Sequence, residues 1–349
     1  MIWLTWRQFR AQAWVASAVL AVIAVALGIT GVHLAHLFDT SGVATCQAHS
    51  DCTTLATSFM NQVKASPTYK ALYDGGTVIL YVAPALIGIF WGAPLVTREV
   101  ETGTFRLAWN QSVTRTRWLA AKLGLIGLAA MATAGLLSLM ITWWASPIDR
   151  ALGLPAGRNG PGGVNRFAPL LFGARGITPI GYAAFAFALG VTAGVLIRRT
   201  VPAMAATLAV FTGALITMSL WVRPHLITPL HVTSALNIAN IDELSIGNGG
   251  QMTVGASVNL PGAWVLSNQS ITASGHVFTG PATQACLSTT ASLQACQNSL
   301  GQLHLRQLVT YQPASRYWAF QGYETAIFLA LALALAGVCF WWIRRRRLA

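Results

Sequence analysis

Few residues of this chain have the types and spacing that chemistry requires. Its lysines are Lys64, Lys70 and Lys122, and none is followed by Ser or Thr, so no P-loop is present to bind nucleotide phosphates. His33 and His36 are three residues apart, as in some metal sites, but no carboxylate or cysteine adjoins them, which favours histidines at a membrane interface. HExxH and GxSxG motifs are absent from the sequence. We therefore predict no catalytic, cofactor-binding or metal site, and any energy must come from another chain.

The cysteines indicate an oxidising compartment. Cys46 and Cys52 share one polar segment, Cys286 and Cys296 share another, and Cys339 lies in an apolar run, where it is a packing residue. On a continuous helix, residues six and ten apart lie about 9 and 15 Å apart, beyond the roughly 7 Å limit between the Cα atoms of a disulfide. Each local bridge therefore requires the chain to turn back, and cross-pairing between the two segments remains open.

The elements that hold these residues are mostly apolar. The chain is 54% hydrophobic and 9% charged, with a mean hydropathy of +0.57, whereas a soluble domain carries roughly a quarter charged residues. Six runs approach or exceed the about 20 apolar residues that cross a bilayer. They are residues 13–36, 77–97, 118–144, 178–197, 201–222 and 324–343. We predict an all-α polytopic membrane protein with six transmembrane helices.

The distribution of charge orients these helices. Segments on the side of the two termini hold 13 basic and 2 acidic residues, and those on the other side hold 9 basic and 7 acidic residues. Because cytoplasmic flanks are enriched in Lys and Arg, both termini are predicted to be cytoplasmic. The net charge of +13 is then mostly a topological signal, which argues against a nucleic-acid partner and favours contact with membrane lipid.

The remaining segments complete the predicted domains. Residues 1–12 mix Trp3, Trp6 and Arg7 in a cytoplasmic amphipathic segment, or else a plain basic flank. Residues 13–222 hold the first five helices, and residues 223–323 form a roughly 100-residue mixed extracellular insert with strand-like alternation before the last helix. Residues 344–349 are a basic cytoplasmic tail.

One cytoplasmic segment, residues 98–117, is richer than a minimal loop. It reads Arg-Glu-Val-Glu-Thr-Gly-Thr-Phe-Arg from position 98, followed by Ser-Val-Thr-Arg from position 112, with Lys122 entering the next helix. Acidic residues favour the start of a short helix, and a glycine allows the chain to break there. Alone, this pattern fits a partner-binding helix and a solvated loop equally well.

Together with the six helices and the aromatic, basic N-terminus, this motif resembles the permease subunit of ABC-2-type transporters of high-GC Gram-positive bacteria. The resemblance implies that the segment docks on an ABC ATPase, which binds ATP and Mg²⁺, while this chain binds neither. It assigns docking to Arg98, Glu99, Glu101, Thr102, Gly103, Thr104, Arg106 and Arg115. It also implies a second permease chain, a location in the plasma membrane, and export of a drug, lipid or lipopeptide, since the helices offer no charged pathway.

The second predicted helix contains helix-weakening residues. Pro84, Gly88 and Pro94 interrupt its hydrogen bonding and form either a hinge or a static kink packed on small residues.

Two other functions remain open at this stage. One is a membrane-anchored sensory or binding protein whose extracellular insert binds a ligand. The other is a membrane enzyme that uses Asp149 with Arg150 or Asp242 with Glu243, although no Ser or His motif accompanies either pair.

Overall fold

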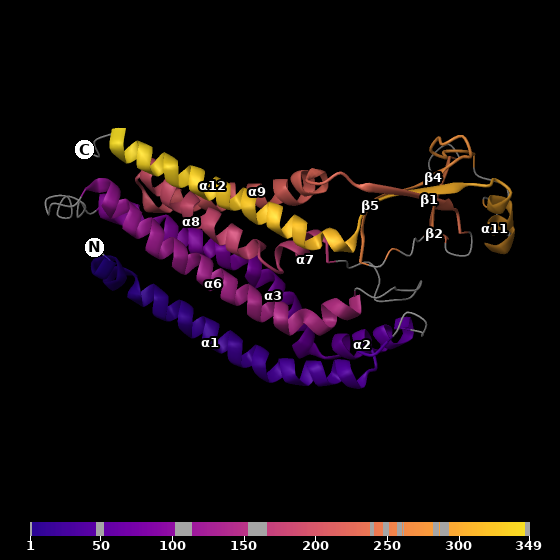
Figure 1. The fold of residues 1–349 in the computed structure, drawn as a ribbon, viewed down its shortest axis with the longest axis horizontal. Coiled ribbons are helices and arrows are strands. Elements are labelled where there is room, and N and C mark those ends of the chain that lie inside the picture. The colour runs from indigo at the N-terminus through magenta and orange to yellow at the C-terminus, as the bar shows by residue number, and fades with distance from the viewer. Residues whose placement is uncertain are drawn as a thin grey trace.

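The protein is elongated, with a helical bundle at one end and a β-rich insert at the other (Figure 1). The computed structural model describes residues 2–46, 52–101, 114–152, 166–237, 241–246, 251–256, 260, 262–281, 286 and 293–345. Both termini lie at the same end of the bundle, here named the termini end, and the opposite end is named the insert end (Figure 1).

Six helical segments are long and apolar enough to cross a membrane, which confirms the number predicted from hydropathy. They are Phe9–Thr40, Pro67–Glu99, Thr116–Leu152, Thr178–Ile197, Thr200–His225 and Ala314–Arg345. Most extend beyond the predicted apolar runs. The hydrophobic run marks only the part that lipid surrounds, whereas the helices continue past it.

The helices of the first half form a layer on one side of the bundle. They are α1 (Ile2–Thr40), α2 (Cys52–Ala65), α3 (Pro67–Leu86), a π-helix (Ile87–Gly92), α4 (Pro94–Glu101) and α6 (Arg115–Leu152). The amphipathic segment predicted at residues 1–12 is the first part of the continuous helix α1. Helix α1 packs on α6, where the Trp144 indole donates to the Thr30 hydroxyl at 2.9 Å.

The second half completes the bundle. It contains α7 (Pro169–Gly173), α8 (Thr178–Ile197), α9 (Thr200–Thr217), a second π-helix (Met218–Val222), a 3₁₀ turn (Arg223–His225), a second 3₁₀ turn (Ala314–Arg316) and α12 (Tyr317–Arg345). Helix α8 is the central span, because 78% of its most apolar window is buried, against 11 to 39% for the other five. Its start is capped from α12, where the Gln321 side-chain oxygen accepts from the backbone N–H groups of Ile177 and Thr178 at 3.1 and 3.2 Å.

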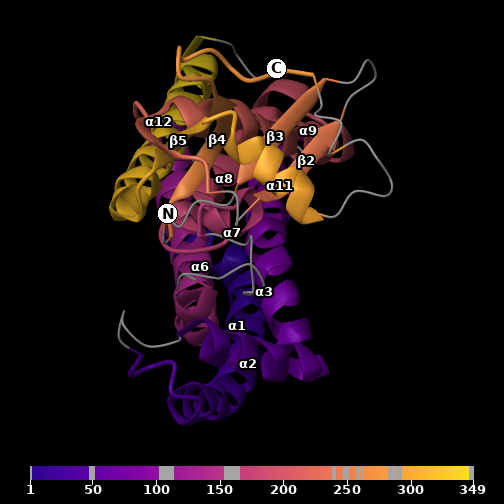
Figure 2. The same ribbon diagram turned by 90° about the vertical axis from the view of Figure 1, so that its right-hand side faces the viewer.

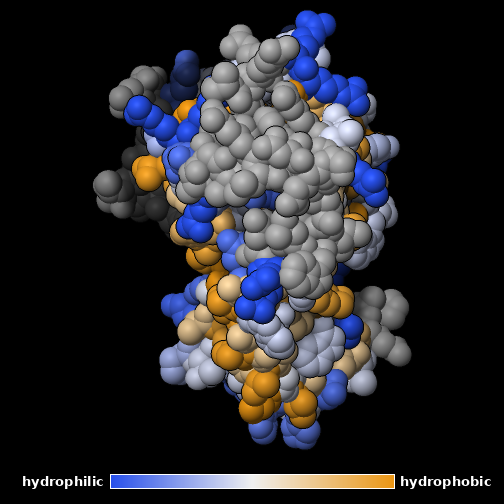
Figure 3. Space-filling view, turned by 90° about the vertical axis from the view of Figure 1, so that its left-hand side faces the viewer, coloured by the Kyte–Doolittle hydropathy of each residue, from blue (hydrophilic) through white to orange (hydrophobic). Residues whose placement is uncertain are grey.

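The outer surface of the bundle is that of a membrane protein. Large apolar side chains such as Val15, Val22 and Val201 are exposed, which lipid permits and water disfavours. Exposed tryptophans occur near both ends of the bundle: Trp6, Trp14 and Trp341 at the termini end, and Trp143, Trp221 and Trp318 at the insert end. In the view of the termini end, hydrophilic side chains are scattered around the edge of the upper part, and hydrophobic ones are mixed with them in the lower part (Figure 3).

The insert contains two small antiparallel sheets. Its strands are β1 (Leu230–Ala235), β2 (Ile241–Ile246), β3 (Met252–Ala256), β4 (Trp264–Ile271) and β5 (Arg306–Gln312). One sheet has the order β1-β5-β4 and the other pairs β2 with β3. Helix α11 (Leu293–Gly301) covers them in front of the bundle (Figure 2). At the two edges of the predicted insert, the 3₁₀ turn Arg223–His225 precedes β1, and the 3₁₀ turn Ala314–Arg316 joins β5 to the start of α12.

Two local disulfides lie at the insert end, one before α2 and one in the β-rich insert. Cys46 is bonded to Cys52 at the start of α2, with 5.7 Å between the Cα atoms. Cys286 is bonded to Cys296 in α11, with a Cα separation of 4.7 Å, and this bond lies in the core of the insert with Met252 and Leu300. The chain therefore turns back at both places, as local pairing requires. Cys339 is a free, buried thiol in α12.

Candidate functional site

The start of the predicted docking segment is anchored by a buried ion pair. Lys122 of α6 donates from Nζ to Glu99 Oε1 of α4, and the side chains are 4% and 16% exposed. The Lys122 ammonium also lies 4.6 Å from the centre of the Trp118 ring. Removing one partner of a buried pair leaves an uncompensated charge, which costs about 3–5 kcal/mol. The contact therefore fixes α4 against the third span.

The second acid of the motif caps a different helix. Glu101 Oε1 accepts from the backbone N–H of Thr200, and Oε2 accepts from the Thr200 hydroxyl, both at 2.9 Å. Thr200 is the first residue of α9, whose N-terminal N–H groups lack partners within the helix and favour a negative charge. The Thr200 hydroxyl is also within hydrogen-bonding distance of the Thr97 hydroxyl, with 2.9 Å between the two oxygens. Helix α4 is thus joined to the fifth span as well as the third.

The turn that presents Thr200 is short. Arg198 ends α8 in the left-handed conformation with φ of 60°, and its N–H donates to Gly194 O at 3.0 Å. Arg199 is extended and Thr200 begins the next helix. A two-residue connection leaves α8 and α9 little freedom to separate at this end. A movement of Glu101, which is bonded to Thr200 of α9, therefore also moves the end of α8.

The N-terminal helix contributes to the same region. The π-helix bonds Ala93 N–H to Gly88 O at 2.9 Å, and Pro94 supplies no N–H, so the carbonyl of Phe90 is left for an outside donor. Gln12 of α1 donates to it at 3.4 Å. A cavity of 260 Å³ lies here, lined by Phe9, Gln12, Phe90, Trp91, Pro94, Leu95, Arg98, Glu99, Lys122 and Ile126. Phe9 and Gln12, from the predicted amphipathic segment, therefore line the same cavity as Arg98 and Glu99 of the motif.

Several predicted docking residues lie outside the described residues. These are Thr102, Gly103, Thr104 and Arg106, while Arg115 begins α6 with a side chain that is also not described. Arg98 is exposed on α4. The structure thus brings Glu99 and Glu101 together with Lys122 and Thr200.

The predicted hinge residues lie in and around the π-helix. Pro84 lies inside α3, Gly88 lies in the π-helix and Pro94 begins α4. A Cβ atom added to Gly88 would lie 2.7 Å from the Ala186 carbonyl oxygen, and one added to Gly92 would lie 2.6 Å from that of Phe187. The backbones of span two and α8 are therefore in close contact at these two glycines.

The relationship to a known family rests on residues 17–223. A family model described as ABC-2 membrane transporter related matches residues 17–223. This chain belongs to that family. No curated protein and no solved structure matches it.

An ABC-2 family member of this kind is a multi-pass protein of the plasma membrane and a transmembrane permease of an ABC transporter. The family in general associates with an ABC ATPase, and this chain is a transport subunit. The matched residues include α4, the start of α6 and the α8–α9 turn, so the anchored site lies inside the family region. The insert and α12 lie beyond it.

The sequence reasoning missed a second polar cluster, at the insert end of this ABC-2 protein. Arg223 donates from Nε and Nη2 to the two carboxylate oxygens of Glu324 at 2.8 and 3.0 Å, and both side chains are 0% exposed. The Tyr182 hydroxyl of α8 also donates to this carboxylate. The predicted sixth span, residues 324–343, begins at Glu324, which puts this carboxylate at the very edge of the span. It lies about two turns inside α12, because a basic partner and a hydroxyl make its burial tolerable.

Proposed function

We propose that this permease is the membrane subunit of an exporter whose separate ATPase docks at residues 98–117. The ATPase would bind ATP and Mg²⁺, and closure of the ATPase would pull on the short segment between α4 and α6. The observation that carries the proposal is the pair of contacts from α4, Glu99 to Lys122 and Glu101 to Thr200. A displacement of this segment is passed to spans three and five without an intervening flexible linker.

The two acids have a positioning role in this mechanism. Glu99 has a partner inside the bundle, and the exposed Glu101 caps α9 with both of its oxygens. Direct contact with the ATPase is then left to Arg98 and the residues that follow Glu101. The N-terminal helix supports the same region through Gln12 and Phe9, the latter stacked edge-on at 4.8 Å against Trp91.

The cargo we propose is hydrophobic or amphipathic. In the six spans, the Asp, Glu, Lys and Arg residues lie toward the helix ends, and α8 has none of them between Thr178 and Ile197. Charged side chains within a span usually mark an ion or proton path, and the middle of these spans offers none. We further propose that a second permease chain, identical or related, completes the pathway, since α8 fills the centre of one copy.

Reconstitution tests the docking proposal. The protein would be placed in liposomes with the nucleotide-binding subunit encoded beside it, and ATP hydrolysis would be measured with and without the permease. Replacing Glu99 and Glu101 together with Ala should lower stimulated hydrolysis at least tenfold, since about 1.4 kcal/mol of lost coupling has that effect. The matched control is the pair Asp39→Ala and Asp74→Ala, two exposed carboxylates at the insert end.

The control pair should hydrolyse ATP normally, and the purified permease alone should not hydrolyse ATP. Membrane insertion and thermal unfolding of both double variants would show that each is folded. Full stimulation by a folded Glu99→Ala, Glu101→Ala variant would refute coupling of the ATPase to the spans through the contacts of α4.

A further inference from the structure

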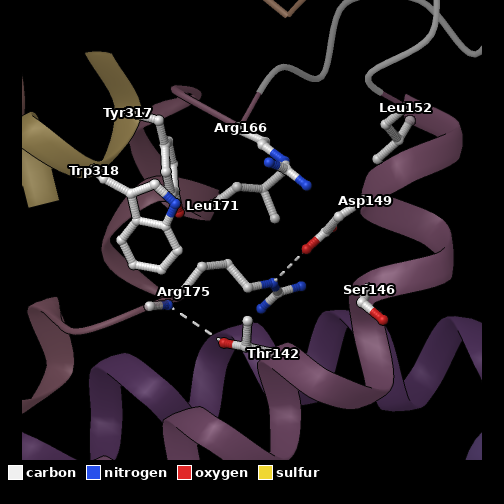
Figure 4. A pocket seen from close by; sticks show the side chains of 10 residues that line it. Thr142, Ser146, Asp149, Leu152, Arg166, Leu171, Arg175, Tyr317 and Trp318 are labelled. Atoms are coloured by element: carbon white, nitrogen blue, oxygen red, sulfur yellow. Dashed lines mark hydrogen bonds and ion pairs between the residues drawn. The ribbon is translucent and has the colours of Figure 1, made fainter. Parts of the chain in front are cut away.

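A second, smaller cavity lies at the insert end of the bundle, and Figure 4 shows the side chains that line it. It has a volume of 90 Å³ and lies between α6, the α7–α8 region and the start of α12. Its lining residues are Thr142, Ser146, Asp149, Leu152, Arg166, Leu171, Arg175, Gly176, Tyr317 and Trp318. This volume is several times what one water molecule needs, and it suits a compact polar group.

Arg175 is the deepest charged residue of the cavity. It is 4% exposed, and its Nε donates to Asp149 Oδ2 at 3.1 Å while Nη1 donates to the Ala174 carbonyl at 3.1 Å. Its Nη2 is buried and has no hydrogen-bond partner among the described residues. A buried guanidinium nitrogen without an acceptor is costly, so the site has a donor ready for a ligand oxygen.

The neighbouring carboxylate is already engaged. Asp149 uses Oδ2 for Arg175 and accepts from the Tyr73 hydroxyl on Oδ1 at 3.1 Å. The ring of Tyr73 also lies 5.1 Å below the Arg175 guanidinium. Asp149 therefore orients Arg175, and the Nη2 donor of Arg175 still has no acceptor among the described residues.

A second guanidinium lies across the cavity. Arg166 is exposed, its guanidinium carbon is 5.9 Å from the centre of the Tyr317 ring, and Figure 4 shows it on the opposite side of the cavity from Arg175. Arg166 and Arg175 against Asp149 leave the lining with one positive charge in excess. Two arginines that converge on a small space match the oxygens of a phosphate group.

We propose that this cavity binds the phosphate of an anionic lipid headgroup. The source is argued from position: Trp318 lines the cavity and is 63% exposed at the end of the bundle where the interfacial tryptophans lie. A phosphodiester carries the single negative charge that the lining lacks. The cavity holds the headgroup phosphate, while the acyl chains lie along the outside of α6 and α12. This inference does not depend on the docking proposal.

Native mass spectrometry of the full chain, released from a neutral detergent, tests the proposal. The probes are phosphatidylglycerol, a diacylglycerol with the same acyl chains, and glycerol 3-phosphate. The test variant is Arg166→Gln, because Arg166 is exposed, and the matched control is Arg150→Gln, an exposed arginine near the end of α6 that does not line the cavity. Ser146→Phe fills the cavity without changing its charge.

We expect the original protein to bind phosphatidylglycerol more tightly than diacylglycerol. Arg166→Gln should bind phosphatidylglycerol about tenfold more weakly than the original protein, and Arg150→Gln should bind it equally well. Ser146→Phe should also lose the bound lipid. If glycerol 3-phosphate binds alone with the same order of variants and phosphatidylglycerol binds no better, the phosphate site stands and the lipid source is wrong. Equal binding of phosphatidylglycerol and diacylglycerol, or equal loss in both arginine variants, would overturn the site.

Discussion

Removing the charge of Glu324 alone should destabilise the protein more than removing it together with Arg223. The variant Glu324→Gln has nearly the same shape and keeps an oxygen to accept from the Tyr182 hydroxyl, but it leaves the Arg223 guanidinium as an unpaired buried charge. Arg223→Met leaves the carboxylate unpaired instead. In the double variant, neither charge remains.

The structure sets the size of these effects. Both side chains are 0% exposed, the two hydrogen bonds measure 2.8 and 3.0 Å, and the Arg223 guanidinium carbon lies 4.2 Å from the Phe172 ring. Losing one partner of such a pair costs about 3–5 kcal/mol, whereas replacing both with uncharged groups of similar size is close to neutral. Each single variant should therefore lose about 3–5 kcal/mol, and the double variant should lose less than either.

Unfolding in mixed micelles, titrated with dodecyl sulfate and followed by circular dichroism, would give the free energy of unfolding of all four proteins. The coupling free energy from this double-mutant cycle should be at least about 3 kcal/mol. A double variant as unstable as the sum of the two single variants would refute the reasoning. So would single variants that unfold like the original protein.

Two further predictions concern packing and the disulfides. Gly92→Ala should destabilise the protein by about 1–3 kcal/mol, because its new Cβ would lie 2.6 Å from the Phe187 carbonyl oxygen, whereas Gly124→Ala, with nothing within 4 Å, should be neutral or slightly stabilising. Thermal unfolding of both variants would test this, and equal midpoints would contradict the close backbone contact. Thiol labelling of the denatured, unreduced protein should modify Cys339 alone, and peptide mapping should find two short-range bridges, so labelling at the four other cysteines would contradict the pairing.

The apolar spans were the most predictable part of the fold. A run of about 20 apolar residues has few alternatives to a transmembrane helix, and the strand-like alternation at residues 252–258 and 264–277 corresponds to β3 and β4. Local patterns of hydrophobicity were sufficient for these elements.

Long-range pairing could not be predicted in the same way. A hydropathy argument ends a span near its first charged residue, so Arg223 was assigned to the insert and Glu324 to the very start of the sixth span, although these residues, 101 positions apart, form an ion pair inside the bundle. Pro84 and Pro94 indicated a weakened helix, but neither residue indicates that a π-helix lies between them with its glycines against the backbone of α8. The motif likewise indicated a special role for Glu101, while its partner Thr200 is visible only in three dimensions.

The central position of α8 has a consequence for synthesis of the protein. Roughly 120 residues separate the end of α8 at Ile197 from the start of α12 at Tyr317, and most of them belong to α9 and the insert. At about 5–20 residues per second, a ribosome needs on the order of 6–24 s to make them. During that time the face of α8 that α12 will cover has no native neighbour. Until α12 is made, the Tyr182 hydroxyl and the Arg223 guanidinium lack Glu324, the carboxylate that both of them contact in the complete chain.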